Sequence, residues 1–298
     1  MPPGRYNSGM VPALLLSAAL VNDIRSLVAR RDFAAAEHAV AAYQSSQGPT
    51  SELAAAVSWM ARGALDAHDY TRAEAYAAEA RQMADGLLPT HPLAHDPWLA
   101  TAIGASIEVH AQALTATGQR DQAVAFLNAQ LAQFDATSLF ERIRKNINLL
   151  SLTGKPAPPL EGVPPAELHG HPLLLFFWAH WCPDCKAEAA ALANLRRAYA
   201  PKGLLLVSPT KLYGYVAGGE QASPDAETRY ISEVWHKYYS PLEGSPTPIS
   251  AKNFMTYGAS TTPTLVLVDA HGIVRYYHPG ALNQAELEAK LAQLVKVE

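Results

Sequence analysis

The chain of 298 residues contains two cysteines, Cys182 and Cys185, which are separated by a proline and an aspartate. Thiol–disulfide exchange requires an attacking thiolate and a second thiol within reach of the mixed disulfide. Two thiols at this spacing meet that requirement. We therefore predict a redox-active cysteine pair that works without a metal, flavin or nucleotide cofactor. Two cysteines in a chain of this length also exclude a small domain stapled by several disulfides.

A strand followed by a helix is predicted to position the pair. Residues 173–179 form a continuous apolar run, as expected of a central strand that is buried on both faces. Helical spacing then extends from Pro183 to Tyr199, so Cys182 lies at the helix start and Cys185 one turn inside it. Backbone N–H groups and the helix dipole stabilise an anion at this end, and we expect the pKa of Cys182 to lie below the unperturbed ~8.5. Cys182 is thus the predicted exposed nucleophile and Cys185 the buried resolving thiol.

The alternation of strands and helices continues after this helix. Apolar runs predict strands at 204–208, 264–268 and 273–277, the last two pairing as an antiparallel hairpin. Helices are predicted at 226–239 and after Asn283, which has the position of an N-cap. The whole pattern predicts an α/β fold with a central mixed sheet flanked by helices.

Residues 209–223 contain three glycines and are predicted to form a loop between the second strand and its helix. A loop of this length is often functional. It either lines a groove beside the cysteines, covers them, or forms a mobile surface insertion, and all three alternatives fit the sequence.

The first half of the chain is rich in alanine and has helical periodicity. A local pattern returns near Phe33, Tyr70 and Arg120, and removing the proline-containing stretch 88–97 brings its period near the ~34 residues of tetratricopeptide repeats. We predict an all-α helical-repeat domain over residues 22–150, made of three tetratricopeptide-like helix pairs. Such a stack presents a concave surface to a protein partner, although a domain that only spaces or dimerises the second half fits equally well.

A proline-rich stretch at residues 154–159, Gly-Lys-Pro-Ala-Pro-Pro, separates the helical half from the rest of the chain. The periodicity changes there from helical spacing to short apolar runs. We therefore predict a domain boundary, with the redox domain over residues 151–298.

Residues 1–21 have the pattern of a signal peptide. One arginine precedes an apolar run over residues 11–21 that is too short to span a membrane, and small residues precede a cleavage position after Ala19. We predict export to the bacterial periplasm or another extracytoplasmic space, with a first helix capped by Asn22 or Asp23. The alternative is that residues 11–21 form one more apolar helix of the first domain.

Charge and ligand spacing exclude other partners. The formal net charge is −4, with 23 basic and 27 acidic residues, so we expect no nucleic-acid partner and no polybasic membrane contact. His91 and His95 have a spacing seen in zinc sites, but a structural site needs four convergent ligands and only one such pair is present nearby. We predict no metal site.

Three motifs of the second domain carry a resemblance to a known family. They are the stretch 154–158, the run from Phe176 to Glu188 (Phe-Phe-Trp-Ala-His-Trp-Cys-Pro-Asp-Cys-Lys-Ala-Glu), and the run from Thr261 to Asp269 (Thr-Thr-Pro-Thr-Leu-Val-Leu-Val-Asp). In combination they resemble the TlpA/ResA-like thiol–disulfide oxidoreductases of the thioredoxin fold. The resemblance implies a protein disulfide reductase that acts on protein thiol or disulfide substrates and is kept reduced by a membrane-bound thiol donor.

The resemblance also implies an acid–base role for Glu188, which lies three residues after Cys185. A glutamate at this position would move a proton to or from the cysteine pair. The alternative is a solvated helix residue that pairs with Lys186 or Arg197.

The same resemblance implies that Pro263 follows a cis peptide bond and faces the cysteines. The backbone of Thr262 would then be free to bind an extended substrate peptide, whereas the alternative is a proline that merely starts an edge strand. Trp181 would shield the cysteines with its apolar face or else be a core aromatic. His180 is predicted to be structural or solvated rather than to tune the thiolate.

Three other functions fit parts of the pattern. These are a disulfide-forming oxidase, a thiol peroxidase, and a redox-sensing protein-interaction module whose repeats bind a partner. The sequence disfavours a peroxidase because the cysteine flanks lack the threonine and arginine that usually accompany a peroxide-attacking cysteine.

Overall fold

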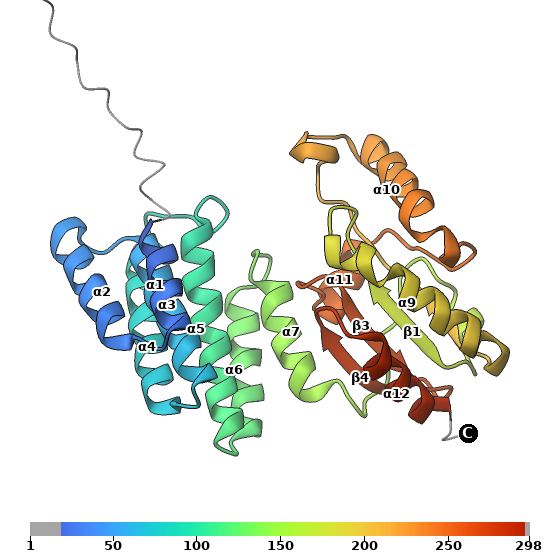
Figure 1. Cartoon of the computed structure of the whole chain (residues 1–298), viewed down its shortest axis with the longest axis horizontal. Coiled ribbons are helices and arrows are strands. Elements are labelled where there is room, and N and C mark those ends of the chain that lie inside the picture. Colours follow the sequence, from blue (N-terminus) through green and yellow to red (C-terminus); the bar gives the residue numbers. More distant parts are fainter. Residues whose placement is uncertain (1–18, 296–298) are drawn as a thin grey trace, which may run out of the picture. The chain divides into compact units, whose positions relative to one another are not determined.

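The computed structural model describes residues 19–295 and divides into two compact units, one up to Phe126 and one from Leu127 onward (Figure 1). The first unit is helical, and the second contains a sheet covered by helices. Over residues 19–295, none of the helices combines the length and the apolar character that crossing a bilayer requires.

The first unit consists of helix pairs that pack through small side chains, as the predicted all-α domain requires. Alanines fill much of its core, and Gly63 lies so close to Val28 that an added methyl group would come within 2.0 Å of the valine side chain. The helices are α1 (Ala19–Ala29), α2 (Phe33–Gln47), α3 (Ser51–Asp66), α4 (Tyr70–Leu87), α5 (Pro97–Ala116) and α6 (Arg120–Gln133), the last of which runs on into the second unit.

The turn inside each pair has the same backbone conformation. Arg31, His68 and Gly118 each have a positive φ, of 60°, 61° and 84°. In all three turns the next backbone N–H donates to a carbonyl near the end of the preceding helix, at 3.0, 2.9 and 2.7 Å. This is the hydrogen bond of a Schellman motif. The repeated sequence pattern therefore corresponds to a repeated turn followed by the start of α2, α4 or α6.

Helix α1 begins before the caps that the sequence predicts. Its first turn contains Leu20 and Val21, which are buried in the core of the unit, so Asn22 and Asp23 lie inside the helix. Burial of these apolar residues outweighs the local preference of Asn and Asp for a cap position. The rest of the predicted signal peptide, residues 1–18, lies outside the described residues.

The second unit contains a four-stranded mixed sheet in the order β2-β1-β3-β4. Strand β1 pairs in parallel with β2 and antiparallel with β3, which in turn pairs antiparallel with β4. This confirms the predicted fold class and the central place of β1, all five residues of which are buried. The strands are β1 (Leu173–Phe177), β2 (Leu205–Val207), β3 (Thr264–Val268) and β4 (Val274–Pro279).

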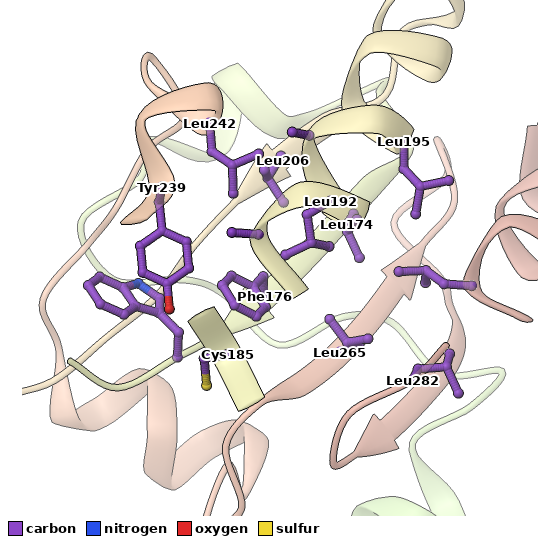
Figure 2. Close-up of a cluster of buried hydrophobic side chains, with 14 of the residues drawn as sticks. Leu174, Phe176, Cys185, Leu192, Leu195, Leu206, Tyr239, Leu242, Leu265 and Leu282 are labelled. Carbon is purple, nitrogen blue, oxygen red and sulfur yellow. The ribbon is translucent and has the colours of Figure 1, made fainter. Parts of the chain in front are cut away.

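Alternate residues of β1 point into two separate cores. Leu174 and Phe176 pack with α9, α10 and α12, and Figure 2 shows them among leucines of α9, with Cys185 at the edge of the cluster. Phe177 points the other way and packs against Phe254 of α11, with ring centroids 5.4 Å apart. The α-helices of the unit are α7 (Phe140–Ser151), α8 (Pro165–Leu168), α9 (Pro183–Tyr199), α10 (Pro224–Tyr239), α11 (Ala251–Tyr257) and α12 (Gln284–Val295), with short 3₁₀ turns at Ala200–Lys202, Ala217–Gly219 and Ser240–Leu242.

Helix α11 has no counterpart in the sequence prediction. Ser250 caps its N-terminus by accepting the N–H of Asn253, and Gly258 ends it with a φ of 62°. A cap residue and a terminal glycine are recognisable signals. The helix between them has only seven residues, too few for a periodic apolar pattern.

Helix α7 packs against α11 within the second unit. A Cβ at Gly258 would come within 2.3 Å of the backbone nitrogen of Lys145, and the side-chain amide of Asn148 donates to the carbonyl of Tyr257 at 2.8 Å. The chain therefore divides within α6, between Phe126 and Leu127, ahead of the predicted boundary at residue 150, and α7 belongs to the second unit. Helical periodicity indicates that a helix has an apolar face but not which core that face covers.

Candidate active site

The two cysteines meet at the N-terminus of α9 and are joined by a disulfide. Cys182 is the N-cap residue, and its Sγ accepts the backbone N–H of Cys185 at 3.1 Å. Pro183 occupies the first helical position, where an N–H would have no helical partner. After reduction, the N–H of Cys185 and the helix dipole are both directed so as to stabilise a thiolate on Cys182.

The segment before β3 covers Cys182. The carbonyl oxygen of Thr262 lies 3.4 Å from Cys182 Sγ, and the peptide bond from Thr262 to Pro263 is cis. Because β3 lies between β1 and β4, the edge-strand alternative for Pro263 is wrong. Cys182 is only 2% exposed and Cys185 is 0% exposed, so the prediction of an exposed nucleophile is corrected to a nearly buried one.

Glu188 lies one turn after Cys185 and is buried, so the alternative of a solvated helix residue is wrong. Its exposure is 8%, and its Oε1 accepts the backbone N–H of Leu282 at 2.7 Å. Burial raises the pKa of Glu188 to about 7, the negative charge of Asp184 adds to the rise, and the Leu282 hydrogen bond opposes it. A carboxyl group with this pKa can take up or release a proton near neutral pH.

Trp181 is 45% exposed, which excludes the alternative of a core aromatic. Its ring lies next to that of Tyr213, with centroids 5.5 Å apart and planes at 81°. Tyr213 belongs to the 209–223 segment, so this segment contributes to the surface beside the cysteines.

His180 is buried and bound to Glu227, so it is structural rather than solvated. Both side chains are 1% exposed, and Nε2 of His180 lies 3.2 Å from Glu227 Oε1. Burial lowers the pKa of His180, although Glu227 opposes that shift. The imidazole is therefore neutral at neutral pH, with the Nε2 hydrogen directed at the carboxylate.

Sequence reasoning missed Glu227 and included Tyr213 only as one residue of the 209–223 segment that could line a groove beside the cysteines. Glu227 lies in the first turn of α10, where an acidic residue is common because it complements the helix dipole. Tyr213 lies in a stretch without periodicity. Glu227 lies 47 residues after His180, so no local sequence pattern indicates that the two side chains are in contact. The fold brings them together.

A family model matches within the second half of the chain. Residues 165–294 match the family model of a thioredoxin-like domain, which includes both cysteines, Glu188 and Pro263. A crystal structure of a thiol:disulfide interchange protein from Chlorobium tepidum aligns over 48% of this chain and 97% of that chain, with 18% identity and a TM-score of 0.37.

Two relatives match a little under half of the chain. The thiol:disulfide interchange protein DsbE of Xylella fastidiosa is 29% identical over 154 residues, which are 49% of this chain and 70% of the relative. The protein of the same name from Tatumella citrea is 32% identical over 143 residues, which are 45% of this chain and 68% of the relative. Together with the mixed sheet and the cysteine pair at the start of α9, these matches show that the chain belongs to the DsbE family of thiol:disulfide interchange proteins.

Proposed function

We propose that this thiol–disulfide oxidoreductase reduces protein disulfides through Cys182 and Cys185. The observation that carries the proposal is the disulfide at the N-terminus of α9, with Cys182 Sγ facing the Thr262 carbonyl and an N–H donor behind it. The relatives are named thiol:disulfide interchange proteins, which supports the same reaction class.

The first step is attack by the reduced chain on a substrate disulfide. The thiolate of Cys182 forms a bond to one substrate sulfur, and the disulfide bond of the substrate breaks. The other substrate sulfur leaves with the electron pair and takes a proton from water. The backbone of Thr262 is proposed to hold the substrate as an extended strand, and Trp181 to cover one side of the reacting sulfurs.

The second step is release of the substrate by Cys185. Its thiol gives a proton to the carboxylate of Glu188, and the resulting thiolate attacks Cys182 Sγ. The mixed disulfide breaks, and the second substrate sulfur leaves as a thiolate that takes a proton in turn. Two electrons have then passed to the substrate, and the chain holds the Cys182–Cys185 disulfide seen in the structure.

A further dithiol protein must return two electrons to this disulfide for another turnover. We propose that this donor is membrane-bound and that the chain works in the periplasm or another extracytoplasmic space. The apolar run at residues 11–21 supports export. The helical first unit is proposed to bind a protein partner, and the repeated turns at Arg31, His68 and Gly118 support a repeat architecture of the kind that does so.

The reduction potential of the Cys182–Cys185 couple tests the direction of electron flow. We expect a value near the ~−270 mV of thioredoxin, together with catalysed reduction of insulin by dithiothreitol. A potential near the ~−120 mV of a strong oxidant would instead favour a disulfide-forming oxidase. Absence of turnover with any protein disulfide, with the couple still reducible, would favour the redox-sensing module.

A further inference from the structure

Glu227 holds the start of the 209–223 segment beside the cysteines. Its buried carboxylate accepts the backbone N–H of Tyr213 at 2.5 Å and that of Gly214 at 2.8 Å, while His180 Nε2 lies 3.2 Å away. Three donors from two separate segments therefore meet one carboxylate. These hydrogen bonds compensate for its removal from water and connect the segment to the residue two positions before Cys182.

Three tyrosine rings surround the imidazole of His180. Tyr213, Tyr215 and Tyr230 approach it edge-on, with centroid distances of 5.5, 5.4 and 5.3 Å. All three are half-buried, and Tyr213 also contacts the exposed ring of Trp181. The four rings of Trp181, Tyr213, Tyr215 and Tyr230 form a surface, the aromatic patch, that begins beside Cys182.

The segment that carries Tyr213 is also anchored on its N-terminal side. The Lys211 ammonium pairs with both oxygens of Glu141 in α7, at 2.6 and 2.8 Å, and the Thr210 hydroxyl donates to the carbonyl of Trp178 at 2.9 Å. Anchors on both sides hold the Tyr213 ring in place before any ligand arrives. Preorganisation of this kind lowers the entropic cost of binding.

We infer that the aromatic patch binds the polypeptide segment next to the reacting cysteine of a substrate and prefers an apolar or aromatic side chain there. His180 and Glu227 act as positioning residues that hold Tyr213 in the patch. The inference rests on the proposed function, because it names the substrate feature that the same site recognises. Continuity with the redox site argues for this occupant, since a sulfur that reaches the nearly buried Cys182 approaches beside its exposed neighbour Trp181.

The chemistry of the patch matches that occupant. Tyrosine and tryptophan offer large, stiff and partly apolar contact areas, and they are enriched at sites that recognise polypeptides. Two charged groups that hold the segment are engaged within the fold, Glu227 with three donors and Lys211 with Glu141. A small hydrophilic disulfide such as that of glutathione has no apolar or aromatic side chain that could pack against these rings.

Two nine-residue peptides test the preference with the full-length reduced protein. Each has a central cysteine in a mixed disulfide with thionitrobenzoate, and the residue after the cysteine is leucine in one and serine in the other. Reaction releases one thionitrobenzoate and one peptide thiol and leaves the Cys182–Cys185 disulfide. We expect the second-order rate constant of this single turnover, followed by thionitrobenzoate release, to be about tenfold larger for the leucine peptide than for the serine peptide.

Variants identify the patch as the source of the preference. Tyr213→Ala is expected to reduce the ratio to about one, while Tyr213→Phe keeps it, because the Tyr213 hydroxyl has no hydrogen-bond partner among residues 19–295. Glu227→Gln should also reduce the ratio, since an amide cannot accept as a carboxylate does from both N–H groups and His180. Glu233→Gln and Tyr238→Ala, on exposed positions of α10, are matched controls.

Two outcomes separate this inference from the proposed function. An unchanged leucine-to-serine ratio in Tyr213→Ala, or a parent ratio near one, would overturn the aromatic patch while the reductase remained. Failure of the parent to react with either peptide or with a small aromatic disulfide would overturn the proposed function itself. If Glu227→Gln does not fold, the Tyr213 pair still decides the question.

Discussion

Glu188 and Leu282, 94 residues apart in the chain, are joined by a hydrogen bond in which the backbone N–H of Leu282 donates to Glu188 Oε1. Oε2 has no hydrogen-bond partner among the described residues. A single donor offsets only part of the cost of burying the charge, so the pKa of Glu188 rises from 4.5 to about 7. Between these pH values the folded chain keeps a proton that the unfolded chain releases.

The replacement Glu188→Gln is expected to stabilise the chain above pH 7 and to change little at pH 4. The stability that the neutral carboxyl contributes is fully present below pH 4.5 and is lost as the pH rises through about 7. Glutamine stays neutral, and its Oε1 can still accept from Leu282. The shift corresponds to a gain of about 3 kcal/mol at most at pH 8. Urea unfolding of the oxidised proteins at pH 4, 6 and 8 measures it.

Glu233→Gln, at an exposed position of α10, serves as the control for this experiment. It should change the free energy of unfolding by about 0.5 kcal/mol or less at every pH. Equal effects of Glu188→Gln at pH 4 and pH 8 would contradict the raised pKa. A parallel measurement of thiol alkylation against pH should differ between Glu188→Gln and the parent if the carboxylate exchanges protons with the cysteines.

Alkylation of the reduced protein should modify Cys182 before Cys185. Cys182 is 2% exposed, and its Sγ accepts a hydrogen bond from the backbone N–H of Cys185. Cys185 is fully buried one turn inside α9. Because access to Cys182 is narrow, replacing N-ethylmaleimide by a bulky maleimide should slow the reaction of Cys182 more than it slows the reaction of free cysteine. Mass spectrometry of peptides after short exposure at pH 7 gives the order. Cys185→Ser should trap a mixed disulfide through Cys182, and preferential labelling of Cys185 would reverse the assignment.

The sequence predicts those parts of the fold whose signals are local. The apolar run at 173–179 indicates a buried strand, and Cys182 and Cys185 follow it at the start of a helix, as observed. Short elements such as α11 and the pairing of α7 with α11 escape prediction. A helix of seven residues is too short to show a periodic apolar pattern. Periodicity also does not indicate which other element a helix packs against.

For the candidate site, the sequence likewise predicts which residues take part but not how exposed they are. Cys182, Cys185, Glu188 and Pro263 are found through motifs, and the fold brings the first two together and places Thr262 against Cys182. The exposure of these residues is not predictable from the motifs, because burial depends on segments far away in the chain. The backbone N–H of Leu282, 94 residues away in the chain, donates to the buried carboxyl of Glu188. The segment that contains Thr262 covers Cys182.

Glycine at the turn positions of the first unit is expected to stabilise the chain. Arg31 and His68 have φ values of 60° and 61°, a conformation in which a Cβ costs about 1 kcal/mol. The third turn already has glycine, Gly118. Arg31→Gly should therefore raise the free energy of unfolding by about 1 kcal/mol, and Gly118→Ala should lower it by a similar amount.

His68→Gly should gain less than Arg31→Gly, because the His68 side chain also contacts the Tyr70 hydroxyl at 3.1 Å. Arg30→Gly, one position before the turn residue Arg31, is the control and should be neutral or destabilising, since the φ of Arg30 is not positive. Thermal unfolding followed by circular dichroism compares the four variants. Destabilisation by Arg31→Gly would show that the turn does not carry the expected strain.

A fragment of residues 127–298 is expected to fold alone, whereas residues 152–298 should be much less stable. Both contain the sheet and the cysteine pair, but the shorter fragment lacks α7. Its removal deprives the Tyr257 carbonyl of the Asn148 amide and Lys211 of its carboxylate partner, and it exposes the side of α11 that α7 covers. Near-ultraviolet circular dichroism and urea unfolding of the two fragments make the comparison.

The variant Gly258→Ala in the longer fragment tests the same contact without truncation. An added methyl group would lie 2.3 Å from the backbone nitrogen of Lys145, at a position where φ is 62°, so α7 would have to move away. We expect a loss of at least 2 kcal/mol of unfolding free energy, through both overlap and backbone strain. Gly244→Ala, where φ is also positive but the nearest neighbour is a flexible arginine end at 3.7 Å, isolates the backbone contribution. Equal losses in the two variants, with a stable fragment of residues 152–298, would mean that α7 is not needed for the fold of the redox unit.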